Sequence, residues 1–147
     1  MTGLVERGKI HDQSKFEDPE MNPYIWITWQ YKCKEDGTKF SAPDKMDEKM
    51  SKATEHHVKN NHHHPESHSK QEVGLINRED RDNPPKEIVD ATGMKDIDIS
   101  EMVADWCAMS DEKKSKPKDW ADKNVNVRWK FSDDQKKLIY ELIEEIF

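Results

Sequence analysis

Seven histidines lie in two places along the chain, and they are the first candidates for chemistry. One is His11. The other six crowd into a short tract, and they are His56, His57, His62, His63, His64 and His68. Neutral imidazole is a common protein ligand for zinc, iron and manganese. By composition alone, such a tract is equally well a polar loop with adventitious metal affinity. The clustering therefore makes a metal site a hypothesis that needs further ligands.

Two aspartates supply candidate oxygen ligands. Asp12 directly follows His11 at the end of a predicted helix, where adjacent side chains point about 100° apart and can reach two metal ions. Asp105 lies between Met102 and Met109 on the apolar face of another predicted helix. A buried carboxylate needs a metal ion or another partner, so an ion pair or a hydrogen bond would explain Asp105 equally well.

Together these side chains form a set of oxygen and nitrogen donors that three helices and a loop could bring together. The candidate metal ligands are His11, Asp12, His57, His63, His64 and Asp105. Mixed His/Asp ligation suits one or two ions of a divalent transition metal (Fe, Mn, Zn or Co), with Mg as a further candidate. Such a site would polarise phosphoryl oxygens and activate water near neutral pH.

Lys15 is a candidate for binding a substrate phosphate. It follows His11 by four residues, so both side chains share a face if the helix extends that far. An ammonium group can hold a phosphate as a point charge, although a lone lysine is more often an ordinary surface residue. Asp12 and Lys15 are thus the candidate catalytic residues.

Three further residues are candidates for orienting the ligands from behind. They are Glu66, Glu101 and Asn60. Glu101 precedes Asp105 by one helical turn, and carboxylates commonly orient a ligating histidine. At most one of His56 and His57 is expected to be a ligand, because adjacent side chains on a helix diverge.

Three blocks of the sequence resemble, in the same order, the signature of a family of small bacterial and phage proteins of unknown function. The blocks are HDQSKF at 11–16, HHVKNNHHHPE at 56–66 and DISEMVADWCA at 98–108, and the closing segment 128–142 is similar as well. That family is similar in turn to the HD superfamily of metal-dependent phosphohydrolases, most closely to its HD-GYP branch.

The resemblance implies an HD-like helical fold and a role for each candidate ligand. Asp12 would bridge two metal ions. Three histidines would complete the ligand set of one ion, and Asp105 would complete the ligand set of the other. Lys15 would contact the phosphate. HD enzymes usually carry a further histidine upstream of this pair. None precedes His11 here, and Glu6 is the candidate substitute. The GYP-type loop is also missing, so a cyclic dinucleotide substrate is not implied.

Helices are expected to position these residues, because alternating β-branched runs are few and Val125–Val127 is the main one. We predict one all-α bundle, a single domain over residues 1–147, with five to seven helices. They cover 4–16, Asn22-Pro23 to about Gly37, a helix opening at 41–44, 98 to about 114, 119–123 and Ser132 to Phe147. Residues 60–85 are predicted as a polar loop, and 87–91 as one short turn.

The spacing of apolar residues predicts which helix faces are buried. The expected core positions are Ile25, Trp26, Trp29, Cys33, Met46, Met50, Ala53, His57, Met102, Val103, Trp106, Met109, Leu138, Ile139, Leu142, Ile143 and Ile146.

The composition of the chain limits the classes of partner and compartment that we expect. The net charge is −7, which argues against a general nucleic-acid binder and favours a small phosphorylated substrate or nucleotide. No apolar run approaches the ~20 residues of a membrane span, and the N-terminus has no signal-like apolar region. Two distant cysteines favour a reducing cytoplasm over a disulfide framework. The oligomeric state stays open, a homo-oligomer included.

The leading hypothesis from the sequence is a metal-dependent phosphohydrolase acting on a phosphomonoester or nucleotide. The alternative is a non-catalytic binding protein in which a structural metal joins helices around a thin core. A nuclease is a third and weaker interpretation, because the negative net charge opposes it.

Overall fold

The computed structural model describes residues 2–70 and 87–147, which form six α-helices, two short 3-10 helices and a two-stranded sheet. The α-helices are α1 (Thr2–Ile10), α2 (Met21–Asp36), α3 (Met46–Asn60), α4 (Asp96–Glu112), α5 (Pro117–Asn124) and α6 (Asp133–Ile146). The 3-10 helices are η1 (Gln13–Phe16) and η2 (Pro65–His68), and the strands are β1 (Val89–Asp90) and β2 (Trp129–Lys130). The described chain is mostly helical, which confirms the predicted all-α class.

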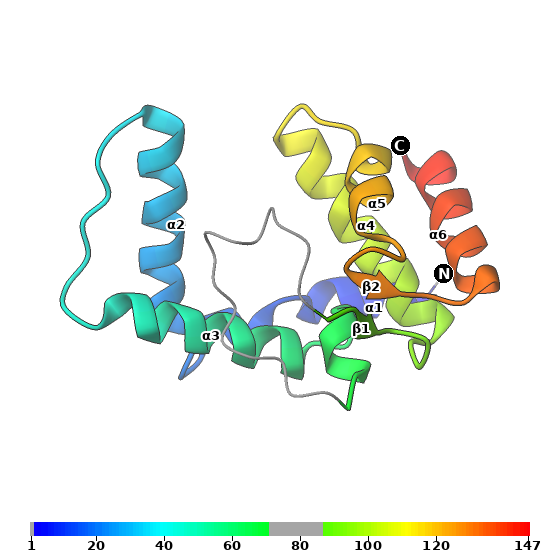
Figure 1. Ribbon diagram of the computed structural model, residues 1–147, viewed down its shortest axis with the longest axis horizontal. Coiled ribbons are helices and arrows are strands. Elements are labelled where there is room, and N and C mark those ends of the chain that lie inside the picture. The colour runs from blue at the N-terminus through cyan, green and yellow to red at the C-terminus, as the bar shows by residue number, and fades with distance from the viewer. Residues whose placement is uncertain (1, 71–86) are drawn as a thin grey trace.

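Two hydrophobic clusters lie at opposite ends of the molecule (Figure 1). The larger one joins α4, α5, α6 and the strands, with Ile99, Val103 and Ile139 fully buried. The smaller one joins α2 and α3 through Ile27, Met46 and Met50. Between them, α1 packs on α4, η1 packs on α2, and η2 packs on both α3 and β1. The elements that carry the candidate ligands are therefore those that connect the two clusters.

The predicted end of the first helix is wrong. The helix ends at Ile10 and does not run to Phe16. Asp12 adopts left-handed backbone angles, with φ 57° and ψ 16°, and a helix cannot continue through that conformation. Aspartate is one of the few residues other than glycine that tolerate the left-handed conformation. The chain then forms the separate turn η1.

The second predicted helix ends where expected, and its predicted buried face is correct for Cys33 and wrong for Ile25 and Trp29. It ends before Gly37, which adopts φ 66° as a left-handed cap. It begins at Met21 with Glu20 at the N-cap, not with Asn22. The buried positions are Pro23, Ile27 and Cys33. Ile25 and Trp29 are more than half exposed, because among the described residues the cluster shared with α3 covers the opposite side of this helix, around Ile27.

The later helices follow the prediction closely. α4 and α5 begin within two residues of their expected starts, and α6 begins after Ser132 with the expected capping box. The expected stripe of α3, Met46 to His57, is buried. The predicted burial of Met109 and Ile146 is wrong, since 42% and 48% of their surfaces are exposed.

Residues 60–85 were expected to be loop, and the described part contains the turn η2. The remainder, 71–86, lies outside the described residues. The expected turn at 87–91 is instead strand β1, which pairs in parallel with β2 through Val89–Trp129 and Asp90–Lys130. Within the described residues, no helix is long and apolar enough to cross a membrane.

Candidate metal centre

Asp12 lies where three elements meet, and its position follows from the break between α1 and η1. Its backbone carbonyl accepts a hydrogen bond from the Lys15 amide at 3.0 Å, which closes the turn. The same turn brings the Lys15 ammonium to 2.5 Å from Oδ2 of Asp12. Lys15 also lies over the Tyr24 ring, 5.1 Å from its centre. Oδ1 of Asp12 points the other way, toward the histidine tract.

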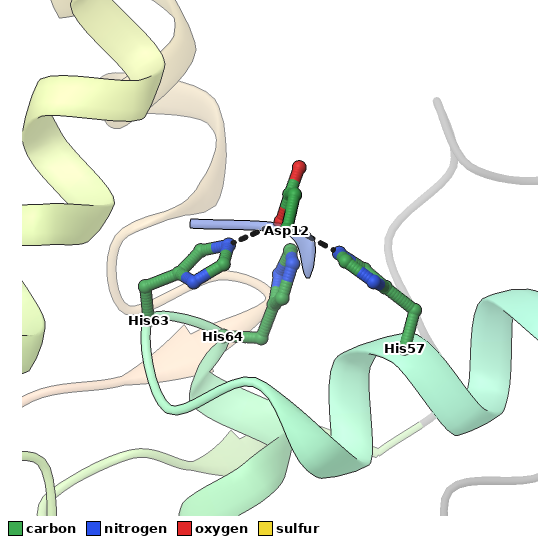
Figure 2. A group of neighbouring side chains, drawn as sticks. All are labelled: Asp12, His57, His63 and His64. Carbon is green, nitrogen blue, oxygen red and sulfur yellow. Dashed lines mark ion pairs between the residues drawn. The ribbon is translucent and has the colours of Figure 1, made fainter. Parts of the chain in front are cut away.

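Three histidines surround the Oδ1 side of Asp12 (Figure 2). Nε2 of His57, from α3, lies 3.1 Å from Oδ1, and Nε2 of His63 lies 3.4 Å from it. The His64 ring lies 4.8 Å from the His57 ring and 4.2 Å from the His63 ring, between centroids. One donor atom from each of the four residues falls within 4.8 Å of the others, so they can share one ion.

A second group of possible ligands adjoins the first. It contains His11, His63 and Asp105, again with donor atoms within 4.8 Å of one another. Nε2 of His11 lies 3.4 Å from Asp105 Oδ1 and 3.6 Å from Asp12 Oδ2. The structure thus brings together all six predicted ligands. Glu6 does not join them, because its side chain is exposed and pairs with Lys9 at 2.7 Å.

The histidine rings are oriented by buried carboxylates. His11 donates from Nδ1 to Glu101 Oε1 at 2.9 Å, and Nδ1 of His63 lies 3.4 Å from the same oxygen. His57 donates from Nδ1 to Glu20 Oε2 at 2.9 Å. In each case Nδ1 faces a glutamate and Nε2 faces Asp12 or Asp105. A donated Nδ1 proton leaves the Nε2 lone pair available for a metal.

Arg7 holds the Glu101 carboxylate in place. Its guanidinium lies 2.7 Å from Glu101 Oε2 and 2.6 Å from Asp98 Oδ1, and both acids are buried on α4. A buried carboxylate without a partner would be costly, so this ion pair both fixes Glu101 and attaches α1 to α4.

The charges at the site shift two ionisation equilibria. Burial opposes ionisation of Asp12, but His57, His63 and Lys15 beside it outweigh that effect and hold the pKa of its carboxyl well below the ordinary value. The interaction with Asp105 is the largest cause that raises the pKa of His11, and burial opposes it. With Glu101 and Asp12 adding to the effect, that pKa rises to about 9. The raised pKa of His11 reflects the carboxylates around its ring, and the lowered pKa of Asp12 reflects the imidazoles and the ammonium group around its carboxylate.

Two buried atoms indicate that a cation fits this site. Oδ1 of Asp12 and Nε2 of His63 have no hydrogen-bond partner among the described residues, although both are buried. Buried polar atoms in native proteins nearly always have a partner, so an exception needs a cause. An ion between Asp12, His57 and His63 would satisfy both atoms. The donor set, a carboxylate with imidazoles, suits a divalent transition metal.

The remaining candidates lie beside the cluster in other roles. Asn60 donates from its side chain to the His56 carbonyl at 2.8 Å. Glu66 accepts a hydrogen bond from Trp129 Nε1 at 2.9 Å, so it attaches η2 to β2. His68 donates from Nε2 to the His62 carbonyl at 2.8 Å and lies outside both ligand groups.

The prediction from the sequence missed four residues around the ligands: Glu20, Ser14, Asn61 and Arg7. Ser14 donates to Glu20 Oε2 at 2.9 Å, and Asn61 donates to Ser14 Oγ at 2.9 Å. Glu20, Ser14 and Asn61 reach His57 only when the chain is folded, and no simple spacing rule relates them to the ligands. Arg7 contacts Glu101 and not a ligand. Asn61 lies one turn after His57, and that proximity was the single available hint.

A cavity of about 140 Å³ opens beside His11 and His63. It is lined by Arg7, Ile10, His11, Asn60, Asn61, His62, His63 and Glu101. The polar lining and small volume match a compact polar group more closely than a long apolar ligand.

Comparison with known proteins gives one family. The model of a family described as "Family of unknown function (DUF5662)" matches residues 1–145. No curated protein and no solved structure matches the chain.

Proposed function

The chain belongs to the DUF5662 family, a family of unknown function, and we propose from its site that the protein is a metal-dependent phosphohydrolase with an HD-like fold. Its substrate would be a phosphomonoester or a nucleotide. One observation carries this proposal: His57 and His63 direct Nε2 toward the same Asp12 oxygen, while buried glutamates take their Nδ1 atoms.

The proposed ligands form two adjoining groups around Asp12. Asp12 with His57, His63 and His64 would hold one ion, and His11 with Asp105 would hold a second beside it. Iron, manganese, zinc and cobalt suit these donors, with magnesium as a weaker candidate. When bound, such an ion supplies a Lewis acid that polarises a phosphoryl oxygen and lowers the pKa of water.

Asp12 is suited to be a ligand and not a general base. Its lowered pKa keeps the carboxylate ionised throughout the physiological pH range, so the group is a good ligand for a cation and a poor acceptor of protons. Lys15 is the proposed phosphate contact. Its ammonium lies beside Asp12, and a third of its side chain is exposed, so it can reach a substrate oxygen as a point charge.

The surroundings favour a small substrate over a polymer. The cavity beside His11 and His63 has room for a compact phosphorylated group. The net charge of −7 repels long polyanions and affects a small phosphate less. These features support a phosphomonoester or nucleotide over a nucleic-acid strand.

The experiment compares the wild type with Asp12→Ala in hydrolysis of p-nitrophenyl phosphate and a nucleotide panel, with Mn, Fe, Co, Zn and Mg supplied in turn. Asp12→Ala should abolish both metal binding and turnover, because Asp12 belongs to the first ligand group and adjoins the second. Gln13→Ala, an exposed neighbour in the same turn, should retain both. Wild-type turnover by the Asp12→Ala protein would overturn the proposal.

A structural metal is the second candidate function, and the two separate hydrophobic clusters favour it. The ligands come from α3, α4 and the turns that connect the clusters, so an ion would join elements that share little apolar contact. A protein with a structural metal would bind the ion tightly, lose stability when a chelator removes it and hydrolyse no substrate in the panel.

A further inference from the structure

Glu20 is a fully buried carboxylate at the N-cap of α2, with none of its surface exposed. Asp, Asn, Ser and Thr are the favoured N-cap residues, because their short side chains bond to the helix backbone. Glu20 makes no such bond. A residue that breaks a local preference while paying the desolvation cost of a buried charge points to a function elsewhere in the structure.

The partners of Glu20 lie at the metal centre. Oε2 accepts hydrogen bonds from His57 Nδ1 at 2.9 Å and from Ser14 Oγ at 2.9 Å. Oε1 accepts one from His56 Nδ1 at 2.6 Å. Among the described residues, its ion pairs are with these two imidazoles and not with a lysine or arginine.

We propose that Glu20 is a positioning residue that fixes the tautomer of His57 for metal binding. A carboxylate can only accept, so the Nδ1 atom of His57 must carry the proton, and Nε2 is left with its lone pair directed at the Asp12 side. This inference rests on the proposed metal site. Glu20 would do for His57 what Glu101 does for His11.

The other neighbours of His57 Nδ1 are an amide nitrogen, which can only donate, and a hydroxyl, which is a weaker acceptor than a carboxylate. Asn61 Nδ2 lies 3.2 Å from Nδ1, and Ser14 Oγ lies 3.3 Å from it. The amide nitrogen is a donor, so without Glu20 it would favour an unprotonated Nδ1. The proton would then be on Nε2, where it blocks the atom that faces Asp12.

His56 fits the same arrangement from the solvent side. Its side chain is 40% exposed and occupies the second oxygen of Glu20, which leaves Oε2 to His57 and Ser14. This explains how two adjacent histidines both serve one site although their side chains diverge: one faces Asp12, and the other restrains the carboxylate behind it.

The test measures Zn²⁺ affinity by competition with a chromophoric chelator for the wild type, Glu20→Ala, Glu20→Gln and Glu17→Ala. Glu20→Ala should bind Zn²⁺ about 10- to 100-fold more weakly, the usual effect of removing such a partner. The Zn²⁺ affinity of Glu20→Gln should lie between those of the wild type and Glu20→Ala, because its carbonyl can still accept from His57 while its amide faces His56. The control, Glu17→Ala, is exposed on the same segment and should bind as the wild type does.

The outcomes separate this inference from the proposed function. Unchanged affinity in a folded Glu20→Ala protein would overturn the positioning role and leave the metal site in place. Absence of Zn²⁺ binding by the wild type would overturn the proposed function itself. A loss of stability in the metal-free state with no loss of affinity would show a merely structural role.

A second measurement needs no substitution. In Zn²⁺-loaded wild-type protein, the ¹⁵N chemical shifts of the His57 ring should show a protonated Nδ1 and a metal-bound Nε2. Metal bound at Nδ1 would overturn the proposal, and this result does not depend on whether any variant folds.

Discussion

The imidazoles of the proposed centre are oriented by residues that do not themselves face a metal. Glu101 lies behind His11 and His63, Glu20 lies behind His57, and Arg7 neutralises Glu101 from α1. Each carboxylate is buried, so its position is set by hydrogen bonds and not by the solvent. The ligand geometry therefore depends on a connected polar network.

Arg7→Ala should lower the free energy of unfolding by about 1–3 kcal/mol, because Asp98 and Glu101 would stay buried without their cation. Urea denaturation of the metal-free protein measures this change. The matched control is Lys9→Ala, which removes an exposed pair with Glu6 from the same helix and should change stability by under about 0.5 kcal/mol. Equal effects of the two substitutions would show that the buried pair contributes nothing special.

Sequence reasoning predicted the candidate ligands and one residue behind them, Glu101, and it missed Glu20 and Arg7. Histidines are few and their clustering is visible, so His57 and His63 could be selected by type and spacing. Glu20 is one of many acidic residues, and it lies 37 positions from the histidine it contacts. Arg7 and Glu101 are further apart still. Such pairs become recognisable only when the chain is folded.

Among the elements, α6 shows how local chemistry fixes a helix. Ser132 Oγ accepts from the Gln135 amide at 3.2 Å, and Gln135 Oε1 accepts from the Ser132 amide at 2.9 Å. Gln135 also donates to the carbonyls of Thr92 and Met94, at 3.1 and 2.9 Å. Its side chain thus both starts α6 and attaches it to the segment before α4.

Gln135→Ala should therefore destabilise the protein more than Ser132→Ala does. Loss of the serine cap costs about 1 kcal/mol, whereas loss of Gln135 also leaves two carbonyls without their donor and costs about 2–3 kcal/mol. Chemical denaturation of both variants gives the comparison, with the exposed substitution Lys137→Ala as the control. A smaller effect at Gln135 than at Ser132 would contradict this view of the contact.

Local signals predicted this element well and predicted others poorly. The capping box of α6 involves four adjacent residues, so the sequence contains the whole interaction. The break of the first helix at Asp12 depends on a left-handed conformation that tertiary contacts stabilise, and periodicity does not encode it. The buried face of α2 depends on which helix covers it, and strand β1 depends on a partner 40 residues later.

At the scale of the whole molecule, the polar centre connects two hydrophobic clusters. The larger cluster involves α4, α5 and α6, and the smaller one involves α2 and α3. An ion held by Asp12, His57 and His63 would join the turn after α1 to α3 and the loop that leads into η2. Metal binding should therefore stabilise the entire fold.

Saturation with Zn²⁺ at about 100 times its dissociation constant should stabilise the protein by about 2.7 kcal/mol and raise the midpoint of thermal unfolding by about 5–10 °C. Removing the ion with a chelator should reverse that shift. His63→Ala should abolish the metal-dependent gain, because His63 belongs to both ligand groups. His62→Ala changes the adjacent histidine, which belongs to neither group, and should retain the gain. A gain that survives in His63→Ala would place the metal elsewhere.

The most direct measurement is the metal content of wild-type protein purified without a histidine tag, determined by elemental analysis. We expect one or two equivalents of a divalent transition metal per chain, because two adjoining ligand groups surround Asp12. Protein that holds no metal as isolated and binds none when Mn, Fe, Co or Zn is supplied would contradict the central claim, and the histidine cluster would then be a polar network without an ion.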